Sequence, residues 1–218
     1  MDYSSVISQI SVLALPVLFA ITLHEAAHGY VAKHFGDLTA YQAGRISLNP
    51  IRHVDPIGTI LVPLVMFLTA GFLFGWAKPV PVNFARLRHP KQDMLWVALA
   101  GPASNLLMAV LWILIANWAL HSAGSDVATW FYAMAKAGIM INVMLMVLNL
   151  IPLPPLDGGR IAVSLLPHPY AYRFAKLEPY GMFILIALLM LEFKSENGFI
   201  IYPLVQLSLK ILLSLFGS

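Results

Sequence analysis

Residues 3–28 read YSSVISQISVLALPVLFAITLHEAAH and place two histidines and a glutamate at the end of a long uncharged run. The part from Tyr3 to Leu23 carries no charged side chain and is long enough to span a bilayer as a helix. Ionisable side chains are costly in hydrocarbon, so their presence in such a segment indicates a function. The stretch therefore predicts a membrane helix that carries a polar site.

The motif His24-Glu25-Ala26-Ala27-His28 has the spacing of a metal site on a helix. Residues four apart share one face of an α-helix, so both imidazoles can reach the same metal ion. Glu25 lies about 100° around the helix, beside the ion. There it can take a proton from a water molecule on the metal, which is the arrangement of a zinc hydrolase.

The composition agrees with an integral membrane protein. Of the 218 residues, 60% are hydrophobic and 11% are charged, whereas soluble domains carry about 25% charged residues. No basic stripe with interleaved aromatic residues is present, so we expect no nucleic-acid partner. The chain has no cysteine, which excludes disulfides and cysteine-ligated zinc. The N-terminus lacks a basic region, so we expect no cleaved signal peptide.

Apolar runs predict an all-α polytopic membrane protein, a bundle of about four to six membrane segments with minor β structure. These runs lie at 5–35, 56–77, 94–120, 128–151, 179–191 and 199–216. Pro203 splits the last run, so we expect the two final segments to be tilted or partly interfacial. We expect a single membrane-embedded domain over residues 1–218, with a catalytic core at about 5–166 and accessory segments at 179–216.

Asp157 is the best candidate for a third metal ligand. A zinc hydrolase needs three protein ligands and an open position for water. Asp157 lies in a proline-rich break after an apolar run, and Gly158-Gly159 would let the backbone pass close to the metal. The alternative is that Asp157 caps a short helix. Glu178 and Glu192 flank an apolar run and resemble ordinary charges at the end of a membrane span.

The basic residues predict which segments share a side of the membrane. Segments 33–55, 75–93 and 152–178 carry Lys and Arg, whereas loop 121–127 carries none. The positive-inside rule places the three basic segments in the cytoplasm, and we expect the site to open towards that side.

This topology depends on the apolar run 56–77. If Asp157 is to join His24, two crossings must separate them, so the run 56–77 cannot cross the bilayer once. We predict a re-entrant hairpin with Pro63 or Gly71 near its turn. The rival is a tilted full span with a site at the midplane.

Three motifs together resemble a known family. They are His24-Glu25-Ala26-Ala27-His28, Gly101-Pro102-Ala103-Ser104-Asn105 and Asn149-Leu150-Ile151-Pro152-Leu153-Pro154-Pro155-Leu156-Asp157-Gly158-Gly159. In this order they resemble the site-2 protease family of intramembrane zinc metalloproteases, in its compact form without PDZ or cystathionine-synthase-like domains. The resemblance implies that one Zn²⁺ per chain is held by His24, His28 and Asp157, with Glu25 as general base. It also implies cleavage of membrane-protein substrates in or near their transmembrane segments, in the cell membrane.

Other polar residues are candidates for roles in catalysis or helix packing. By the resemblance, Asn105 and Asn149 match polar positions near the catalytic centre. We expect Asn105 to be catalytic, as a donor to the scissile carbonyl or the substrate backbone, with a helix–helix contact as the alternative. Asn149 fits either role equally. His53 is expected to be an auxiliary group or a loop residue, and the extended segments 41–48 and 78–84 could offer a strand edge to an unwound substrate.

Three alternatives remain open at this point. A non-proteolytic membrane scaffold or binding protein could hold zinc, but it would not need Glu25 as a general base. A metal transporter would need polar residues along a pathway, and the apolar runs offer little beyond Asn105, Asn142 and Asn149. A membrane-anchored protease could use Glu178 in place of Asp157. The expected partners are a transmembrane substrate and the lipid bilayer; the sequence leaves the oligomeric state open.

Overall fold

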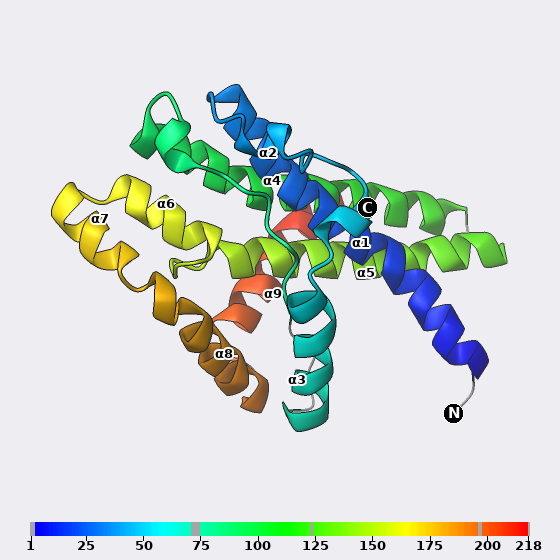
Figure 1. Cartoon of the computed structure of the whole chain (residues 1–218). Helices are drawn as coiled ribbons and strands as arrows, with labels where there is room; N and C mark the ends of the chain where they lie inside the picture. Colours follow the sequence, from blue (N-terminus) through cyan, green and yellow to red (C-terminus); the bar gives the residue numbers. More distant parts are fainter. Residues whose placement is uncertain (1–2, 71–74, 123, 196–197, 218) are drawn as a thin grey trace.

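The computed structural model describes residues 3–70, 75–122, 124–195 and 198–217. Its α-helices are α1 (Tyr3–His34), α2 (Thr39–Gln42), α3 (Val62–Ala70), α4 (Pro90–His121), α5 (Asp126–Leu150), α6 (Asp157–Leu165), α7 (His168–Ala175), α8 (Glu178–Lys194) and α9 (Ile201–Phe216). Two 3-10 helices, η1 (Pro50–His53) and η3 (Phe84–Arg86), and a π-helix, η2 (Pro56–Leu61), lie between them. The predicted all-α class is confirmed (Figure 1). The expected minor β structure does not form within the described ranges.

Three helices are long and apolar enough to cross a membrane. They are α4, α5 and the part of α1 at Ser11–His34. The helices α7 and α8 meet at 64° and would together make a fourth, broken span. The chain is thus a multi-pass membrane protein with three candidate spans, or four with the bent pair, at the lower end of the four to six segments predicted.

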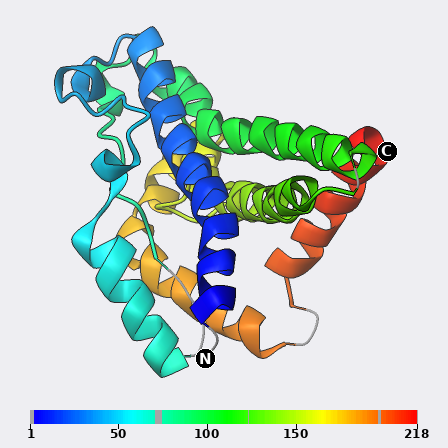
Figure 2. The same ribbon diagram turned by 90° about the vertical axis from the view of Figure 1, so that its right-hand side faces the viewer.

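The core lies where α4 and α5 run side by side and α1 crosses them (Figures 1 and 2). Small residues allow close packing here, because Ala109 and Ala135 have no exposed surface. A Cβ added at Gly138 would lie 2.5 Å from the Trp112 ring, so this glycine makes room for the indole. Ser125 caps α5 by accepting a hydrogen bond from the N–H of Ala128 at 3.1 Å, which fixes the turn between the two helices.

The described parts of the segment 56–77 begin and end at the same place. The helices η2 and α3 follow each other without a break, and α3 projects away from the α4–α5 pair (Figures 1 and 2). At its end, the N–H of Trp76 donates to the carbonyl of Gly58 at 3.0 Å, and the Thr59 hydroxyl donates to the carbonyl of Trp76 at 3.0 Å. A segment whose two ends meet does not cross a membrane once, which agrees with a hairpin; its re-entry into the bilayer stays a prediction.

The details of two predicted turns differ from expectation. Pro63 is not at the hairpin turn, because it lies inside α3, and Gly71 lies outside the described residues. Pro203 does not split the final apolar run. It occupies the first turn of α9, where a helix tolerates proline because the first N–H groups have no partner within the helix.

The basic segments gather at one end of the bundle. The Arg88 guanidinium donates to the carbonyl of His34, and the Arg88 N–H donates to the carbonyl of Phe35 at 2.9 Å, which ties the start of α4 to the end of α1. The Lys91 ammonium donates to the carbonyl of Leu166 just after α6. The C-terminal ends of α1 and α5 therefore lie on the same side of the bundle. Helices α4 and α5 are the two crossings that we predicted between His24 and Asp157.

Asp37 is a buried anchor of this basic end. Its carboxylate accepts hydrogen bonds from the N–H and the hydroxyl of Thr39 and from the N–H of Asn83. Burial alone would raise the pKa of Asp37, but these hydrogen bonds outweigh burial and lower the pKa below its ordinary value of 3.8. The ionised carboxylate thus joins the loop after α1 to the segment that returns from the hairpin.

Candidate metal centre

Helix α1 presents His24 and His28 on one face, as their spacing predicts. Their Nε2 atoms lie 3.1 Å apart, and the two rings meet edge to face with centroids 4.7 Å apart. His24 is 7% exposed. Both histidines lie within the part of α1 that is apolar enough to cross a membrane. The pair is thus held inside the bundle rather than on a loop.

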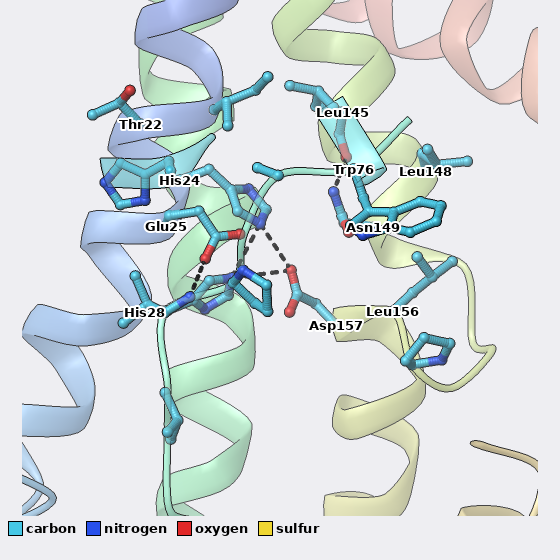
Figure 3. A pocket seen from close by; sticks show the side chains of 18 of the residues that line it. Thr22, His24, Glu25, His28, Trp76, Leu145, Leu148, Asn149, Leu156 and Asp157 are labelled. Carbon is cyan, nitrogen blue, oxygen red and sulfur yellow. Dashed lines mark hydrogen bonds and ion pairs between the residues drawn. The ribbon is translucent and has the colours of Figure 1, made fainter. Parts of the chain in front are cut away.

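Asp157 completes a cluster of three possible metal ligands. It is the first residue of α6, directly after the proline-rich break, and its Oδ2 atom lies 3.3 Å from the Nε2 atoms of both His24 and His28. Figure 3 shows the three side chains converging. Within the described ranges, no other group of three His, Asp or Glu side chains meets in this way. Glu178 instead pairs with Arg160 at 3.5 Å and takes no part in the cluster.

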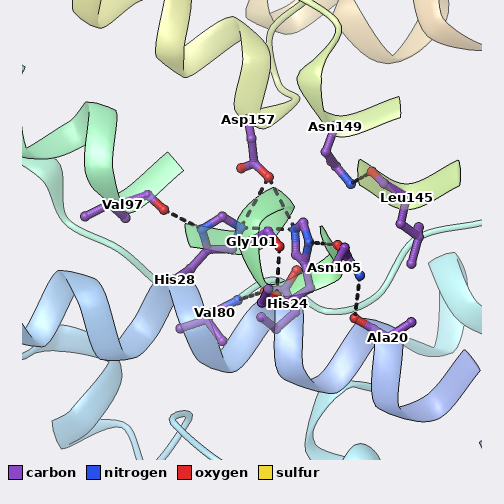
Figure 4. Close-up of polar contacts among 12 residues, drawn as sticks. Ala20, His24, His28, Val80, Val97, Gly101, Asn105, Leu145, Asn149 and Asp157 are labelled. Atoms are coloured by element: carbon purple, nitrogen blue, oxygen red, sulfur yellow. Dashed lines mark hydrogen bonds and ion pairs between the residues drawn. The ribbon is translucent and has the colours of Figure 1, made fainter. Parts of the chain in front are cut away.

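Hydrogen bonds behind the two imidazoles fix their tautomers. The Nδ1 atom of His28 lies 2.7 Å from the carbonyl oxygen of Val97, and the Nδ1 atom of His24 lies 2.6 Å from Oδ1 of Asn105 (Figure 4). A carbonyl oxygen only accepts, so each Nδ1 must carry the proton. In a neutral imidazole with this tautomer, Nε2 carries the lone pair, and each Nε2 faces the other histidine and Asp157.

The centre of the cluster is consequently a place for a cation. Three acceptor atoms face one another, and Oδ2 of Asp157 is buried without a hydrogen bond from the described part of the chain. Zinc bonds of about 2.0–2.1 Å at tetrahedral angles separate the ligand atoms by about 3.3 Å. The observed separations of 3.1–3.3 Å fit this geometry. The donor set of two imidazoles and one carboxylate is also one that zinc accepts in hydrolases.

Gly101 of α4 makes room for the two imidazoles, a role that we did not predict from the sequence. A Cβ at this position would lie 2.4 Å from Nε2 of His28 and 2.5 Å from Cε1 of His24. Its place in the motif with Asn105 was the available signal. Gly158 and Gly159 directly follow Asp157 and pack tightly against neighbouring backbone. Their added Cβ atoms would meet the carbonyl oxygens that end α5 and the backbone of the proline-rich break.

Glu25 lies beside the cluster and contacts the segment that returns from the hairpin. Its Oε2 atom accepts a hydrogen bond from the N–H of Val80 at 2.7 Å. Gly29, one turn further along α1, leaves room for the side chains of Ile46 and Val80 to pack against the helix. The carboxylate is therefore positioned by a backbone donor next to the three candidate metal ligands.

Asn105 lies behind His24 rather than at the wall of the pocket. It has no exposed surface, and its amide Nδ2 already donates to the carbonyl of Ala20 at 3.2 Å and to Oδ1 of Asn142 at 3.0 Å. Both amide hydrogens are thus in use, and a direct contact with substrate, as expected from the sequence, would require one of these bonds to break. The position suits Asn105 to orienting His24.

The remaining candidates line the pocket or its edge. Asn149 faces the pocket, and its amide donates to the carbonyl of Leu145 within α5 at 2.9 Å (Figures 3 and 4). His53 is 2% exposed, and its Nε2 lies 2.9 Å from the carbonyl oxygen of Ser47. Its auxiliary role stays a prediction. The segment 78–84 passes the site without forming a strand, and residues 41–42 belong to α2.

A large pocket opens over the cluster. Its volume is about 730 Å³, and apolar side chains from α1, α5, α8 and the returning segment form most of its wall, among them Leu18, Ile21, Trp76, Leu145, Leu148 and Leu185. Figure 3 shows Glu25, Asp157 and Asn149 at its polar side. A pocket of this size and polarity fits an apolar stretch of polypeptide whose backbone reaches the polar group.

Comparison with known proteins shows clear similarities. Residues 113–191 match the family model described as Peptidase family M50, a range that includes Asp157 but not His24. The chain is 36% identical over 210 residues to Putative zinc metalloprotease YwhC of Bacillus subtilis (strain 168), covering 94% of this chain and 91% of that protein. It is 31% identical over 179 residues to Putative zinc metalloprotease Rip2 of Mycolicibacterium smegmatis, covering 79% and 64%. No solved structure matches it significantly.

Proposed function

The chain belongs to peptidase family M50, the site-2 protease family of zinc metalloproteases, and we propose that it hydrolyses peptide bonds in or near transmembrane segments of membrane proteins. Its cofactor is Zn²⁺, as for the metalloproteases that it resembles. One observation carries the proposal on the substrate. The three possible metal ligands lie within the bundle, on a helix apolar enough to span a membrane, at the polar side of a largely apolar pocket. Such a site is suited to a segment that arrives from the lipid.

In the proposed centre, His24, His28 and Asp157 hold one zinc ion per chain. Two neutral imidazoles and one carboxylate leave one position open for water, as in a catalytic rather than a structural zinc site. The contacts at Nδ1 of His24 and His28 support this assignment, because in the neutral imidazoles they leave the Nε2 lone pairs to the metal. Asp157 supplies the charge that compensates part of the ion's charge in an apolar setting.

The proposed catalytic step relies on Glu25. When bound, zinc supplies Lewis acidity to a water molecule and to the scissile carbonyl. Glu25 would accept the proton of the attacking water and pass it to the leaving amide nitrogen. The hydrogen bond from the N–H of Val80 supports this role, because it orients one carboxylate oxygen and leaves the other free to face the ligands. The apolar wall would limit access of bulk water to the reacting peptide bond.

The decisive experiment measures zinc content and cleavage of a fluorogenic transmembrane peptide by the reconstituted protein. We expect Glu25→Gln to keep about one zinc ion while cleavage falls about 10²–10⁴-fold, as for the loss of a general base. Asp157→Ala should lose both zinc and cleavage. Glu178→Ala is the matched control, because that acid lies outside the cluster and its loss should leave both unchanged.

Two outcomes would contradict the proposal. If Glu25→Gln cleaves as fast as the wild-type protein, the proposed mechanism is wrong. If the wild-type protein binds zinc but cleaves no peptide from a panel of membrane helices, the non-proteolytic binding protein is the better interpretation. The same cleavage sequence in a soluble peptide tests the membrane part of the proposal, since we expect the bilayer-embedded form to be cut faster.

We also propose that the protein resides in the cell membrane as a single domain, with its basic end in the cytoplasm. The gathering of Arg45, Arg88, Lys91 and other basic residues at one end supports this orientation. The chain has no cysteine, so single-cysteine variants can report it. In intact cells an impermeant maleimide should label Ser122→Cys but not Gln42→Cys. The reverse labelling would show that the orientation is inverted.

A further inference from the structure

We propose that Asn142 is a positioning residue for the metal centre, which sets the tautomer of His24 through Asn105. Asn142 lies on α5, has no exposed surface, and is not among the residues that line the pocket. Among the described residues, its side chain forms hydrogen bonds only with Asn105 and with the carbonyl of Gly138 in its own helix. The inference rests on the zinc site proposed above and adds to it a buried chain of hydrogen bonds that joins α5, α4 and α1.

The chain of bonds starts at a backbone carbonyl of α5. The amide Nδ2 of Asn142 donates to the carbonyl oxygen of Gly138 at 2.8 Å. A backbone carbonyl can only accept, so this contact determines which end of the Asn142 amide is the nitrogen. The Oδ1 atom of Asn142 must then face the other way, towards Asn105.

Asn105 is oriented by two acceptors in the same manner. Its Nδ2 donates to the carbonyl of Ala20 on α1 and to Oδ1 of Asn142. With both hydrogens committed, the amide oxygen of Asn105 points at Nδ1 of His24, 2.6 Å away. The proton of His24 is thereby held on Nδ1, and its Nε2 lone pair faces His28 and Asp157.

Reversal of the Asn105 amide would disable the metal ligand. The nitrogen would then donate to Nδ1 of His24, so the imidazole proton would move to Nε2 and point into the cluster. In the native protein this reversal would set the Asn105 oxygen against two other oxygens, those of Ala20 and Asn142. Asn142 supplies one of these two constraints, and its replacement by an apolar side chain removes that constraint.

The competing interpretation is that Asn142 only joins helices. A hydrogen-bonded asparagine in a membrane bundle commonly holds helices together, and its loss would then affect stability alone. The two interpretations differ in the zinc ligand field. A positioning residue changes the affinity and coordination of the metal, whereas a residue that only joins helices does not.

The experiment compares zinc affinity and Co²⁺ absorption of the purified full-length protein with those of Asn142→Leu. We expect zinc binding to weaken about 10–100-fold, as for other groups that orient a metal-bound histidine. The visible bands of the Co²⁺-substituted variant should shift or lose intensity. Asn142→Asp should restore both, because a buried aspartic acid stays protonated and can donate to Gly138 while accepting from Asn105.

Asn117→Leu is the matched control. Asn117 lies on α4 and donates its amide to the carbonyl of Phe216 at 2.8 Å, so it joins helices away from the metal centre. We expect this variant to keep wild-type zinc affinity. If Asn142→Leu does not fold, ¹⁵N spectra of histidine in the zinc-loaded wild-type protein provide a second test. They should show His24 coordinated through Nε2 and protonated on Nδ1.

The outcomes separate this inference from the proposed function. Wild-type affinity and an unchanged Co²⁺ spectrum in a folded Asn142→Leu variant would overturn the role of Asn142 alone. Coordination of His24 through Nδ1 would also overturn it, while leaving a zinc protease in place. If the wild-type protein binds no zinc at all, the proposed function fails together with this inference.

Discussion

Replacement of Gly101 by alanine should disable the metal centre through a single methyl group. The added Cβ would lie 2.4 Å from Nε2 of His28 and 2.5 Å from Cε1 of His24, whereas ordinary van der Waals contact begins at 3.4 Å. The two rings, or helix α4 itself, must therefore move by about 1 Å. Ligand distances in a metal site are held to about 0.2 Å, so a shift of this size cannot be absorbed within the site.

We expect Gly101→Ala to weaken zinc binding by about 100-fold or more, which is at the upper end of the effect of changes around a metal site. Isothermal titration or competition with a coloured chelator in detergent would measure this affinity. The matched control is Ala109→Val, which overpacks the same face of α4 two turns away, where Ala109 is fully buried. This control should cost about 1–3 kcal/mol of stability and leave zinc affinity unchanged. Wild-type affinity in Gly101→Ala would refute the geometry described for His24 and His28.

Three further predictions concern the rest of the protein. Removal of zinc by a chelator should lower the melting temperature reversibly. Without the cation, the acceptor atoms of His24, His28 and Asp157 would face one another. An unchanged melting temperature would argue against a metal site at this cluster. The difference in unfolding free energy between the wild-type protein and Asp37→Asn should be constant above about pH 4. It should shrink as the pH falls through the lowered pKa of Asp37, because folding stabilises the ionised carboxylate. Thermal unfolding between pH 3 and pH 6 would measure this difference. Arg160→Ala should change the free energy of unfolding by less than about 1 kcal/mol in denaturant titrations, because its pairing with Glu178 is largely solvated; a larger loss would reveal a role beyond that pair.

Local patterns were sufficient to predict much of this architecture. Apolar runs of about 20 residues identified α1, α4 and α5, because the bilayer fixes the length of a spanning helix. The period of the helix placed His24 and His28 on one face. The excess of basic residues predicted which helix ends share a side, and this in turn predicted the hairpin at 56–77.

Other features depend on contacts between distant segments and carry no local signal. The position of Asn105 behind His24 follows from the approach of α4 to α1, so the residue type alone could not separate orienting a ligand from contacting substrate. The hydrogen bond from Val80 to Glu25 forms only because the segment that follows the hairpin passes next to the site. From the sequence alone, Gly101 is a glycine that could serve helix packing. The structure shows that the two imidazoles lie against it and leave no room for a side chain.

The proposed ligands are far apart along the chain, and this has a consequence for biosynthesis. A ribosome delivers His24 and His28 to the membrane with the first helix, whereas Asp157 emerges only after α5 has been made. Until then the two histidines lack their carboxylate partner, and metal binding and folding of the centre are coupled. A nascent chain would therefore carry an incomplete centre through most of its synthesis. Proteolytic competence would be acquired late, which would protect the insertion machinery and neighbouring nascent helices from premature cleavage.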